Sequence, residues 1–194
     1  MARVPEVNRE DLLPEQQHIF DEIGRSRNGR VGAPFKILLN SPEAAGRVAH
    51  LGAYVRFEST LSPVQHSLTA LTVAREMDCQ FEWTVNEGSG RAAGVREEAI
   101  EALRHRRAPE GLTPEETVVV RYGQELLRNQ RVSDETYQAA VQLLGRQGVT
   151  DLTVSYGYYT FVACAMNAFE VEPDLGRRPT LPIGLPGEFA GAPD

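Results

Sequence analysis

Signals for the start of a helix recur along this chain and constrain its fold more than any other feature. Serine or threonine stands directly before proline at Ser41-Pro42, Ser62-Pro63 and Thr113-Pro114. The hydroxyl can accept a hydrogen bond from a free N–H of the first helical turn, and proline at the first position removes no donor that the helix needs. Each of these sites therefore predicts that a helix begins there.

Apolar residues at helical spacing extend this interpretation over most of the chain. One helix is predicted from Asp11 to about Arg27. Another carries residues 79 to about 93 and ends at Gly94, because glycine readily closes a helix in the left-handed conformation. A helix opening at Ser133 ends near Gly145, and the strongly apolar stretch 148–169 predicts a central or subunit-facing helix.

The segment Phe35–Leu39 is apolar but too short for its period to separate a strand from a helical turn. No convincing pair of strands is present elsewhere. We therefore predict an all-α fold, a compact bundle of about seven helices in one domain over residues 9–172. Residues 1–8 are predicted to be disordered, and the proline- and glycine-rich residues 173–194 to form an extended tail.

Composition and charge narrow the classes of partner. The formal net charge is −7, whereas nucleic-acid binding needs a concentrated basic surface, so we expect no nucleic-acid partner. The polar N-terminus lacks an apolar signal core, and no apolar run approaches the ~20 residues needed to span a membrane. We expect a cytoplasmic protein that makes no membrane contact.

The segment Cys79–Asn86 contains the strongest candidates for functional groups in the chain: a thiol, a carboxylate and an amide. Cys79, Glu82 and Asn86 are spaced i, i+3 and i+7, which places them on one face of a helix. Phe81 and Trp83 flank Glu82, and partial desolvation there would raise the carboxyl pKa toward neutrality, suiting it to proton transfer. The alternative is a surface glutamate or an ion pair between subunits.

Cys79 has two interpretations. It can be a reactive thiol, but a small buried apolar side chain is the commoner role of a free cysteine, and no basic residue at helical spacing lowers its pKa. Glu82 has no histidine three or four positions away, so we predict no metal site, and no phosphate-binding glycine loop is present. We expect no cofactor.

The chain resembles the carboxymuconolactone decarboxylase family, which includes the alkyl hydroperoxidase D-like proteins. The resemblance spans about residues 9–172 and implies an all-helical fold that assembles into trimers or hexamers, with sites in part between subunits. It rests on the order of these runs: Leu38–Glu43, Leu61–Pro63, Cys79–Trp83, Ala92–Val95, Glu125-Leu126, Arg131–Asp134, Tyr158-Tyr159 and Asn167-Ala168.

Three positions depart from the family pattern. Decarboxylase-type members carry a histidine where this chain has Asn86, and members commonly carry a glutamate where it has Ser67. Peroxidase-type members carry a second cysteine where it has Glu82, so the redox pair of cysteines is absent. Asn86 cannot exchange a proton, but it can orient a substrate carbonyl or be a polar filler. Ser67 can contact substrate or simply pack.

Other side chains are weaker candidates. His50 and His66 could replace the missing histidine in space, although each is more often a surface or core residue. Trp83 and Tyr54 could line an apolar pocket with Tyr156, Tyr158 and Tyr159, with core packing as the alternative.

Three functions follow as hypotheses. The first is a cofactor-independent, decarboxylase-like lyase acting on a small carboxylated or lactone-type, aromatic-derived molecule, with Glu82 as general acid or base and Asn86 orienting the substrate. The second is a thiol peroxidase-like activity through Cys79. The third is a non-catalytic assembly protein that keeps only the scaffold. The sequence leaves the substrate, the reaction direction and the oligomer number open.

Overall fold

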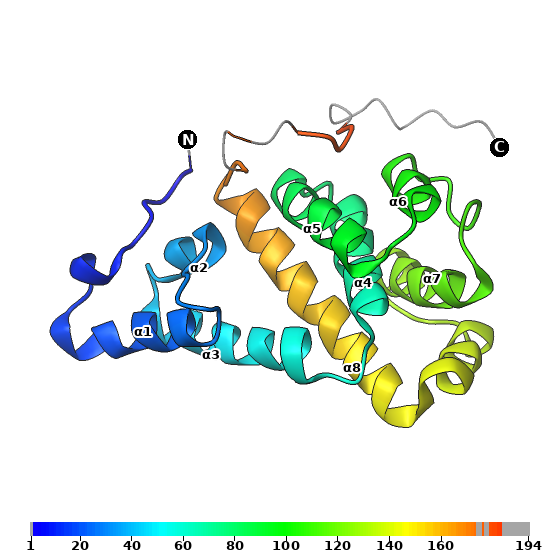
Figure 1. Cartoon of the computed structure of the whole chain (residues 1–194), viewed down its shortest axis with the longest axis horizontal. Coiled ribbons are helices and arrows are strands. Elements are labelled where there is room, and N and C mark those ends of the chain that lie inside the picture. The colour runs from blue at the N-terminus through cyan, green and yellow to red at the C-terminus, as the bar shows by residue number, and fades with distance from the viewer. Residues whose placement is uncertain (1, 174–175, 177–178, 184–194) are drawn as a thin grey trace.

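The computed structural model describes residues 2–173, 176 and 179–183 of the 194-residue chain, and every regular element within them is helical (Figure 1). The predicted all-α fold is confirmed, with eight α-helices in these residues instead of about seven. They are α1 (Gln17–Arg25), α2 (Ala33–Leu38), α3 (Pro42–Ala53), α4 (Pro63–Glu76), α5 (Gln80–Ala93), α6 (Glu97–Arg104), α7 (Pro114–Asn129) and α8 (Asp134–Ala168).

The helix starts lie where the Ser/Thr-Pro pairs predicted them. The Ser62 hydroxyl accepts from the Gln65 N–H at 3.2 Å, and the Gln65 side chain accepts from the Ser62 N–H at 2.9 Å. Thr113 and Glu116 form the same reciprocal pair at the start of α7. α3 also begins at Pro42, although the Ser41 side chain makes no capping bond. Local capping chemistry therefore fixes two of these three starts.

The predicted helix from Asp11 begins later than expected. Two short 3₁₀ turns, Arg9–Asp11 and Pro14–Gln16, precede α1, which begins only at Gln17. Pro14 has no N–H and its ring clashes with a carbonyl one turn earlier, so a continuous α-helix cannot pass through it. The ambiguous segment 35–39 is largely helical, because it falls in α2 with Pro34 in its first turn.

α8 joins two predicted helices end to end. Gly145 has φ 69° and ψ 175°, a backbone conformation outside the helical range that breaks the helix into two parts. The second part lies diagonally through the middle of the molecule in Figure 1. Its Leu152, Tyr156 and Ala163 side chains are fully buried, which agrees with the central position predicted for this stretch.

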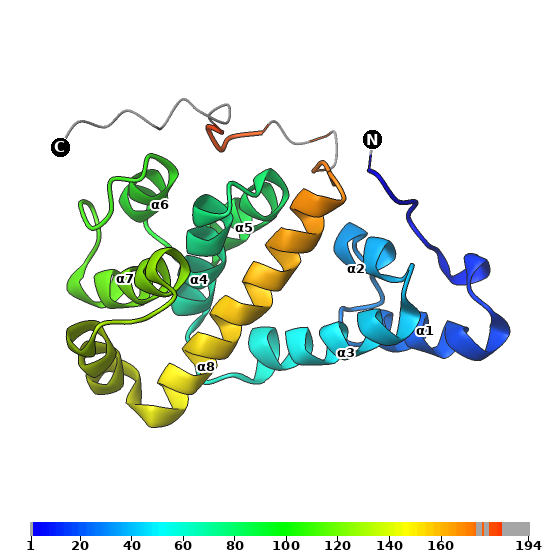
Figure 2. The same cartoon turned by 180° about the vertical axis from the view of Figure 1, so that it is seen from behind.

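The helices form two groups, one on each side of α8. Helices α4–α7 lie on one side and α1–α3 on the other, and the two groups exchange places when the molecule is seen from behind (Figure 2). The larger group shares the main hydrophobic core with α8. The smaller group has its own cluster of buried side chains: Leu12, Ile19, Ile23, Phe35, Leu39, Ala45 and Ala49.

Both ends of the chain make contacts with this body. Residues 2–8, for which the sequence predicted disorder, include Arg3, whose N–H donates to the Phe169 carbonyl at 2.8 Å, and Val7, whose N–H donates to the Lys36 carbonyl at 3.0 Å. In the described part of the predicted tail, Leu181 is buried and the Arg75 guanidinium donates to the Pro182 carbonyl at 2.9 Å. The remaining tail residues lie outside the described ones.

No helix among the described residues has the length and apolar character that crossing a membrane requires.

Candidate functional site

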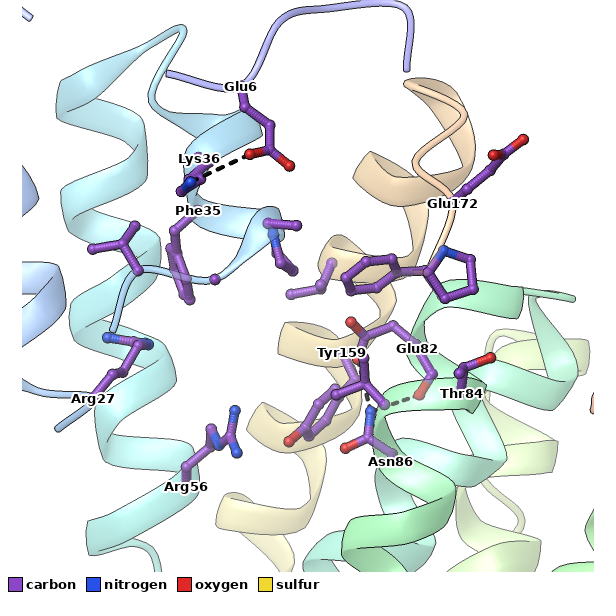
Figure 3. A pocket seen from close by; sticks show the side chains of 18 of the residues that line it. Glu6, Arg27, Phe35, Lys36, Arg56, Glu82, Thr84, Asn86, Tyr159 and Glu172 are labelled. Atoms are coloured by element: carbon purple, nitrogen blue, oxygen red, sulfur yellow. Dashed lines mark hydrogen bonds and ion pairs between the residues drawn. The ribbon is translucent and has the colours of Figure 1, made fainter. Parts of the chain in front are cut away.

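A cavity of about 670 Å³ lies between the two groups of helices. Its size is within the range of small-molecule sites. Figure 3 shows Arg27 and Arg56 on one side of it and Glu82 and Asn86 on the other, with Tyr159 between them. The residues that line it come from four separate stretches of the chain, 6–36, 56, 81–86 and 158–173, and include Arg27, Phe35, Lys36, Arg56, Phe81, Glu82, Val85, Asn86, Tyr158, Tyr159, Val162 and Glu172.

Glu82 and Asn86 line this cavity from α5. The Glu82 side chain belongs to a residue only 5% exposed, and burial raises its pKa to about 7. The hydrogen bond from Asn86 and the charge of Arg56 act in the opposite direction but do not cancel the effect of burial. At neutral pH the carboxyl is therefore divided between its acid and base forms.

Asn86 directs its amide toward Glu82. Its Nδ2 atom donates to Glu82 Oε2 at 3.0 Å and to the Glu82 carbonyl oxygen at 2.8 Å. A side-chain amide has two N–H bonds, so these two contacts use both. Asn86 thus holds the carboxyl in place and has no N–H left for a substrate.

Cys79 does not line the cavity that Glu82 faces. It is the N-cap residue directly before α5, in an extended conformation (φ −88°, ψ 96°), and its carbonyl accepts from the Trp83 N–H at 3.0 Å. The thiol is completely buried, and burial raises its pKa to about 12. It is protonated at neutral pH and lies outside the cavity lining. The other thiol, Cys164 on α8, is exposed.

Of the other predicted pocket residues, Tyr158 and Tyr159 line the cavity, whereas Ser67, Tyr54, His50 and Trp83 are not part of its lining. The Ser67 hydroxyl donates to the Pro63 carbonyl within α4 at 2.8 Å, and Tyr54 donates to Asp151 Oδ1 at 2.8 Å. His50 is exposed on α3. Trp83 is fully buried outside the cavity lining, and its Nε1 donates to Glu87 Oε2 and Thr180 Oγ1, each at 3.2 Å.

Arg56 also lines the cavity, although no sequence pattern marks it as a site residue. It lies in the π-helical turn Tyr54–Glu58 that follows α3, where the Ser59 N–H donates to the Tyr54 carbonyl, five residues back, at 2.9 Å. Among the described residues its guanidinium has no hydrogen bond or ion pair, and its contact is with the ring of the adjacent Phe57, 5.7 Å away. A π turn changes which side chains face inward, and no motif announces it.

Arg27 adds a second positive charge to the same wall. Its guanidinium lies 4.1 Å from the centre of the Phe35 ring and donates to the Ala49 carbonyl at 3.1 Å. Its Nε atom is buried without a partner among the described residues. The wall opposite Glu82 therefore carries two guanidinium groups.

Tyr159 brings a histidine to the edge of the site. Its hydroxyl lies 2.9 Å from His66 Nε2 on α4, and the two rings meet edge to face with centroids 5.4 Å apart. Burial, together with the charge of Arg56, lowers the pKa of His66 to about 4, so the imidazole is neutral at pH 7. His66 and Tyr159 are 93 positions apart in the sequence, and only the packing of α4 against α8 brings them together.

Metal ligands are not gathered in the described residues: no three His, Cys, Asp or Glu side chains lie close enough to hold an ion.

Comparison with known proteins adds a family and a fold. Residues 42–125 match the model of the carboxymuconolactone decarboxylase family. No curated protein matches the sequence.

Several solved structures share the fold at low sequence identity. An uncharacterised peroxidase-related protein from Silicibacter sp. TM1040 has a TM-score of 0.72 and 16% identity, covering 90% of this chain and 93% of that one. A protein of unknown function from Agrobacterium tumefaciens, with a suggested role in antioxidant defence as AhpD, has a TM-score of 0.63 and 17% identity, covering 70% and 94%. The debrominase Bmp8, in complex with 2,3,4-tribromopyrrole, has a TM-score of 0.69 and 9% identity, covering 90% and 95%.

At these identities the structural likeness establishes the fold. The matched segment runs from α3 into α7 and includes Glu82, Asn86 and Arg56. Together with the alkyl hydroperoxidase D-like fold, this match over residues 42–125 supports the resemblance to the carboxymuconolactone decarboxylase family.

Proposed function

We propose that this protein is an acid–base enzyme, independent of a cofactor, that moves a proton at a carbon atom of a small carboxylated molecule. The observation that carries the proposal is the position of Glu82: a buried carboxyl group with a pKa near 7 that lines a cavity facing two arginines. A group that titrates near the working pH can both accept and donate a proton during turnover.

Arg27 and Arg56 support an anionic substrate. Guanidinium groups bind carboxylates through charge-assisted hydrogen bonds, often two at once. Arg56 has no such partner among the described residues, so its donors are available to a ligand. A substrate carboxylate bound by Arg56 would leave its reacting carbon toward the Glu82 wall.

Asn86 acts in this proposal as a positioning residue. Its amide keeps Glu82 Oε2 fixed and leaves Oε1 for the proton that moves. This replaces the expected role of orienting a substrate carbonyl, because both amide hydrogens are directed to Glu82.

The thiol alternative receives less support. Peroxide reduction needs a thiolate, and a completely buried thiol with a pKa of about 12 supplies almost none near neutral pH. The non-catalytic alternative would fit a site filled by side chains, whereas Glu82 and Asn86 face open space. A small-molecule substrate and a homo-oligomer, a trimer or hexamer, remain parts of the proposal.

The test is deuterium exchange from solvent into small carboxylated lactones and ketones, followed by proton NMR. We expect wild-type protein to exchange one carbon-bound hydrogen in at least one class of compound, and Glu82→Gln to lower that rate by ~10²–10⁴-fold, the usual contribution of a placed acid or base. Glu98→Gln is the matched control, because its side chain is 68% exposed on α6. Unchanged exchange in Glu82→Gln would sink the proposal.

A further inference from the structure

The proposed function, on which this inference rests, requires a second group in the cavity. When a base removes a proton from carbon next to a carbonyl, negative charge collects on the carbonyl oxygen. Hydrogen-bond donors aimed at that oxygen are the usual means of stabilising it. Asn86 cannot be this donor, since Glu82 occupies both of its N–H bonds.

Tyr159 has the position and the chemistry for this role. Its side chain lines the cavity from α8, next to the α5 wall that carries Glu82. The hydroxyl is fixed by His66 Nε2 at 2.9 Å, and the ring is held between His66 and Tyr158, with edge-to-face centroid distances of 5.4 and 5.3 Å. A phenol fixed in this way loses little freedom when it binds a ligand.

The protonation states leave the phenolic hydrogen available. Burial raises the pKa of Tyr159, so the hydroxyl keeps its proton at neutral pH. His66 is neutral and carries one N–H. With that hydrogen on Nε2, the imidazole donates to the Tyr159 oxygen, and the Tyr159 hydrogen is free to point into the cavity.

We infer that Tyr159, held in place by His66, is the hydrogen-bond donor to the substrate oxygen that becomes negatively charged while Glu82 moves the carbon proton. The carbon-bound proton passes to a Glu82 oxygen, the C–H electron pair forms a C=C bond, and the carbonyl π pair moves to oxygen. The Tyr159 O–H stays intact and donates to that oxygen. Return of the proton from Glu82 reverses each change.

The ligand class follows from this arrangement. The cavity should favour a planar oxyanion on an unsaturated carbon, an enolate or a phenolate, over the neutral hydroxyl compound. Tyr159 donates to the oxygen directly, and the charge of Arg56, which acts on both Tyr159 and His66, has the sign that attracts an anion. His66 is a positioning residue, since it acts through Tyr159.

4-Nitrophenol is a suitable probe, because its ionised form absorbs visible light and reports its own protonation. The titration is done below pH 7, where Glu82 is mostly uncharged. We expect wild-type protein to bind the probe and to raise its ionised fraction above that in free solution. Tyr159→Phe should weaken binding of the ionised form about tenfold, the effect of losing one hydrogen bond to a charged group.

Two controls separate this inference from the proposed function. Tyr137→Phe removes an exposed hydroxyl from the same helix and should leave probe binding unchanged. Glu82→Gln should still bind 4-nitrophenol. If this variant binds the probe normally but no longer catalyses deuterium exchange, proton transfer by Glu82 and oxyanion binding by Tyr159 are separate functions. Absence of probe binding by the wild type, or equal binding by Tyr159→Phe, overturns the inference while leaving the role of Glu82 intact.

His66 variants test the positioning role. His66→Gln keeps an N–H that can reach the Tyr159 oxygen and should retain most of the probe affinity. His66→Ala should lose as much affinity for the probe as Tyr159→Phe does. If His66 only supports packing, the probe affinities of the two variants will agree and only their thermal unfolding midpoints will differ, which contradicts the inference.

Discussion

At the scale of single residues, Glu82 shows how burial produces function at a cost in stability. The carboxyl ordinarily titrates at 4.5 and here titrates at about 7. Above pH 4.5 the unfolded chain releases this proton while the folded chain still holds it, so the folded state is progressively disfavoured as the pH rises to about 7. Because one pKa unit corresponds to about 1.4 kcal/mol, the total is about 3 kcal/mol.

This predicts a pH-dependent gain in stability for Glu82→Gln. Relative to the wild type, the variant should gain up to about 3 kcal/mol in the free energy of unfolding between about pH 4.5 and about pH 8, because glutamine has no proton to release. Urea unfolding of both proteins at several pH values measures the difference. Glu98→Gln, with its exposed side chain, should show no comparable trend. A flat difference for Glu82→Gln would show that the folded carboxyl titrates normally.

At the scale of helices, local sequence predicted where most elements begin and end. Ser62 and Thr113 form the expected caps, and Gly94 closes α5 with φ 96°. These features depend on neighbours within a few residues, and therefore they can be inferred from sequence. The predicted start at Asp11 was too early, because Pro14 cannot lie inside a helix and instead opens the 3₁₀ turn that leads into α1.

The site was predictable only in part. Glu82 was identified from its own segment, but its cavity depends on Arg27, Arg56 and Tyr159, which lie far from it in the sequence. Such pairings depend on how helices pack, and periodicity does not encode them. The surroundings of Cys79 were likewise not predictable: it is the N-cap residue of α5, directly after the left-handed Asp78, and it lies outside the cavity lining.

Two glycine-to-alanine substitutions, at Gly123 and Gly88, test the packing between helices. A Cβ atom at Gly123 on α7 would overlap the ring of Tyr156, whose hydroxyl donates to the Val119 carbonyl at 2.8 Å. We expect Gly123→Ala to destabilise the fold by about 1–3 kcal/mol, as overpacking usually does. Gly88→Ala is the matched control: a Cβ there meets no atom within 4 Å, and alanine should stabilise α5 by up to about 1 kcal/mol. Equal unfolding midpoints for the two variants would contradict this packing.

At the scale of the whole molecule, the charge at the cavity wall has the opposite sign to the net charge of the chain. The chain carries a net charge of −7, yet Arg27 and Arg56 lie together on one wall of the cavity. The smaller group of helices and its π turn supply this positive wall, and the larger group supplies the carboxyl. The two hydrophobic clusters thus hold opposite halves of one site.

This arrangement predicts selective binding of organic anions. Arg56→Gln should weaken the binding of benzoate by about tenfold at low ionic strength, since one charge-assisted hydrogen bond is lost. Because Arg56 is exposed, added salt should reduce the difference between the two proteins. Arg47→Gln, which removes a largely exposed charge from α3, is the control. Calorimetric titration measures all three proteins, and equal affinities would exclude Arg56 from anion binding.

The π turn after α3 also affects how this chain should be compared with homologous sequences. It has the geometry of a helix that has gained one residue, and its Ser59-to-Tyr54 hydrogen bond spans that extra position. A homologue shorter by a single residue between Ala53 and Ser59 would continue as an ordinary α-helix, and every later side chain of the turn would rotate by about 100°. Such a homologue could have an arginine at the position equivalent to Arg56 and still direct a different side chain into the cavity. The length of this turn, as well as the residue type at position 56, therefore decides which side chain faces the cavity.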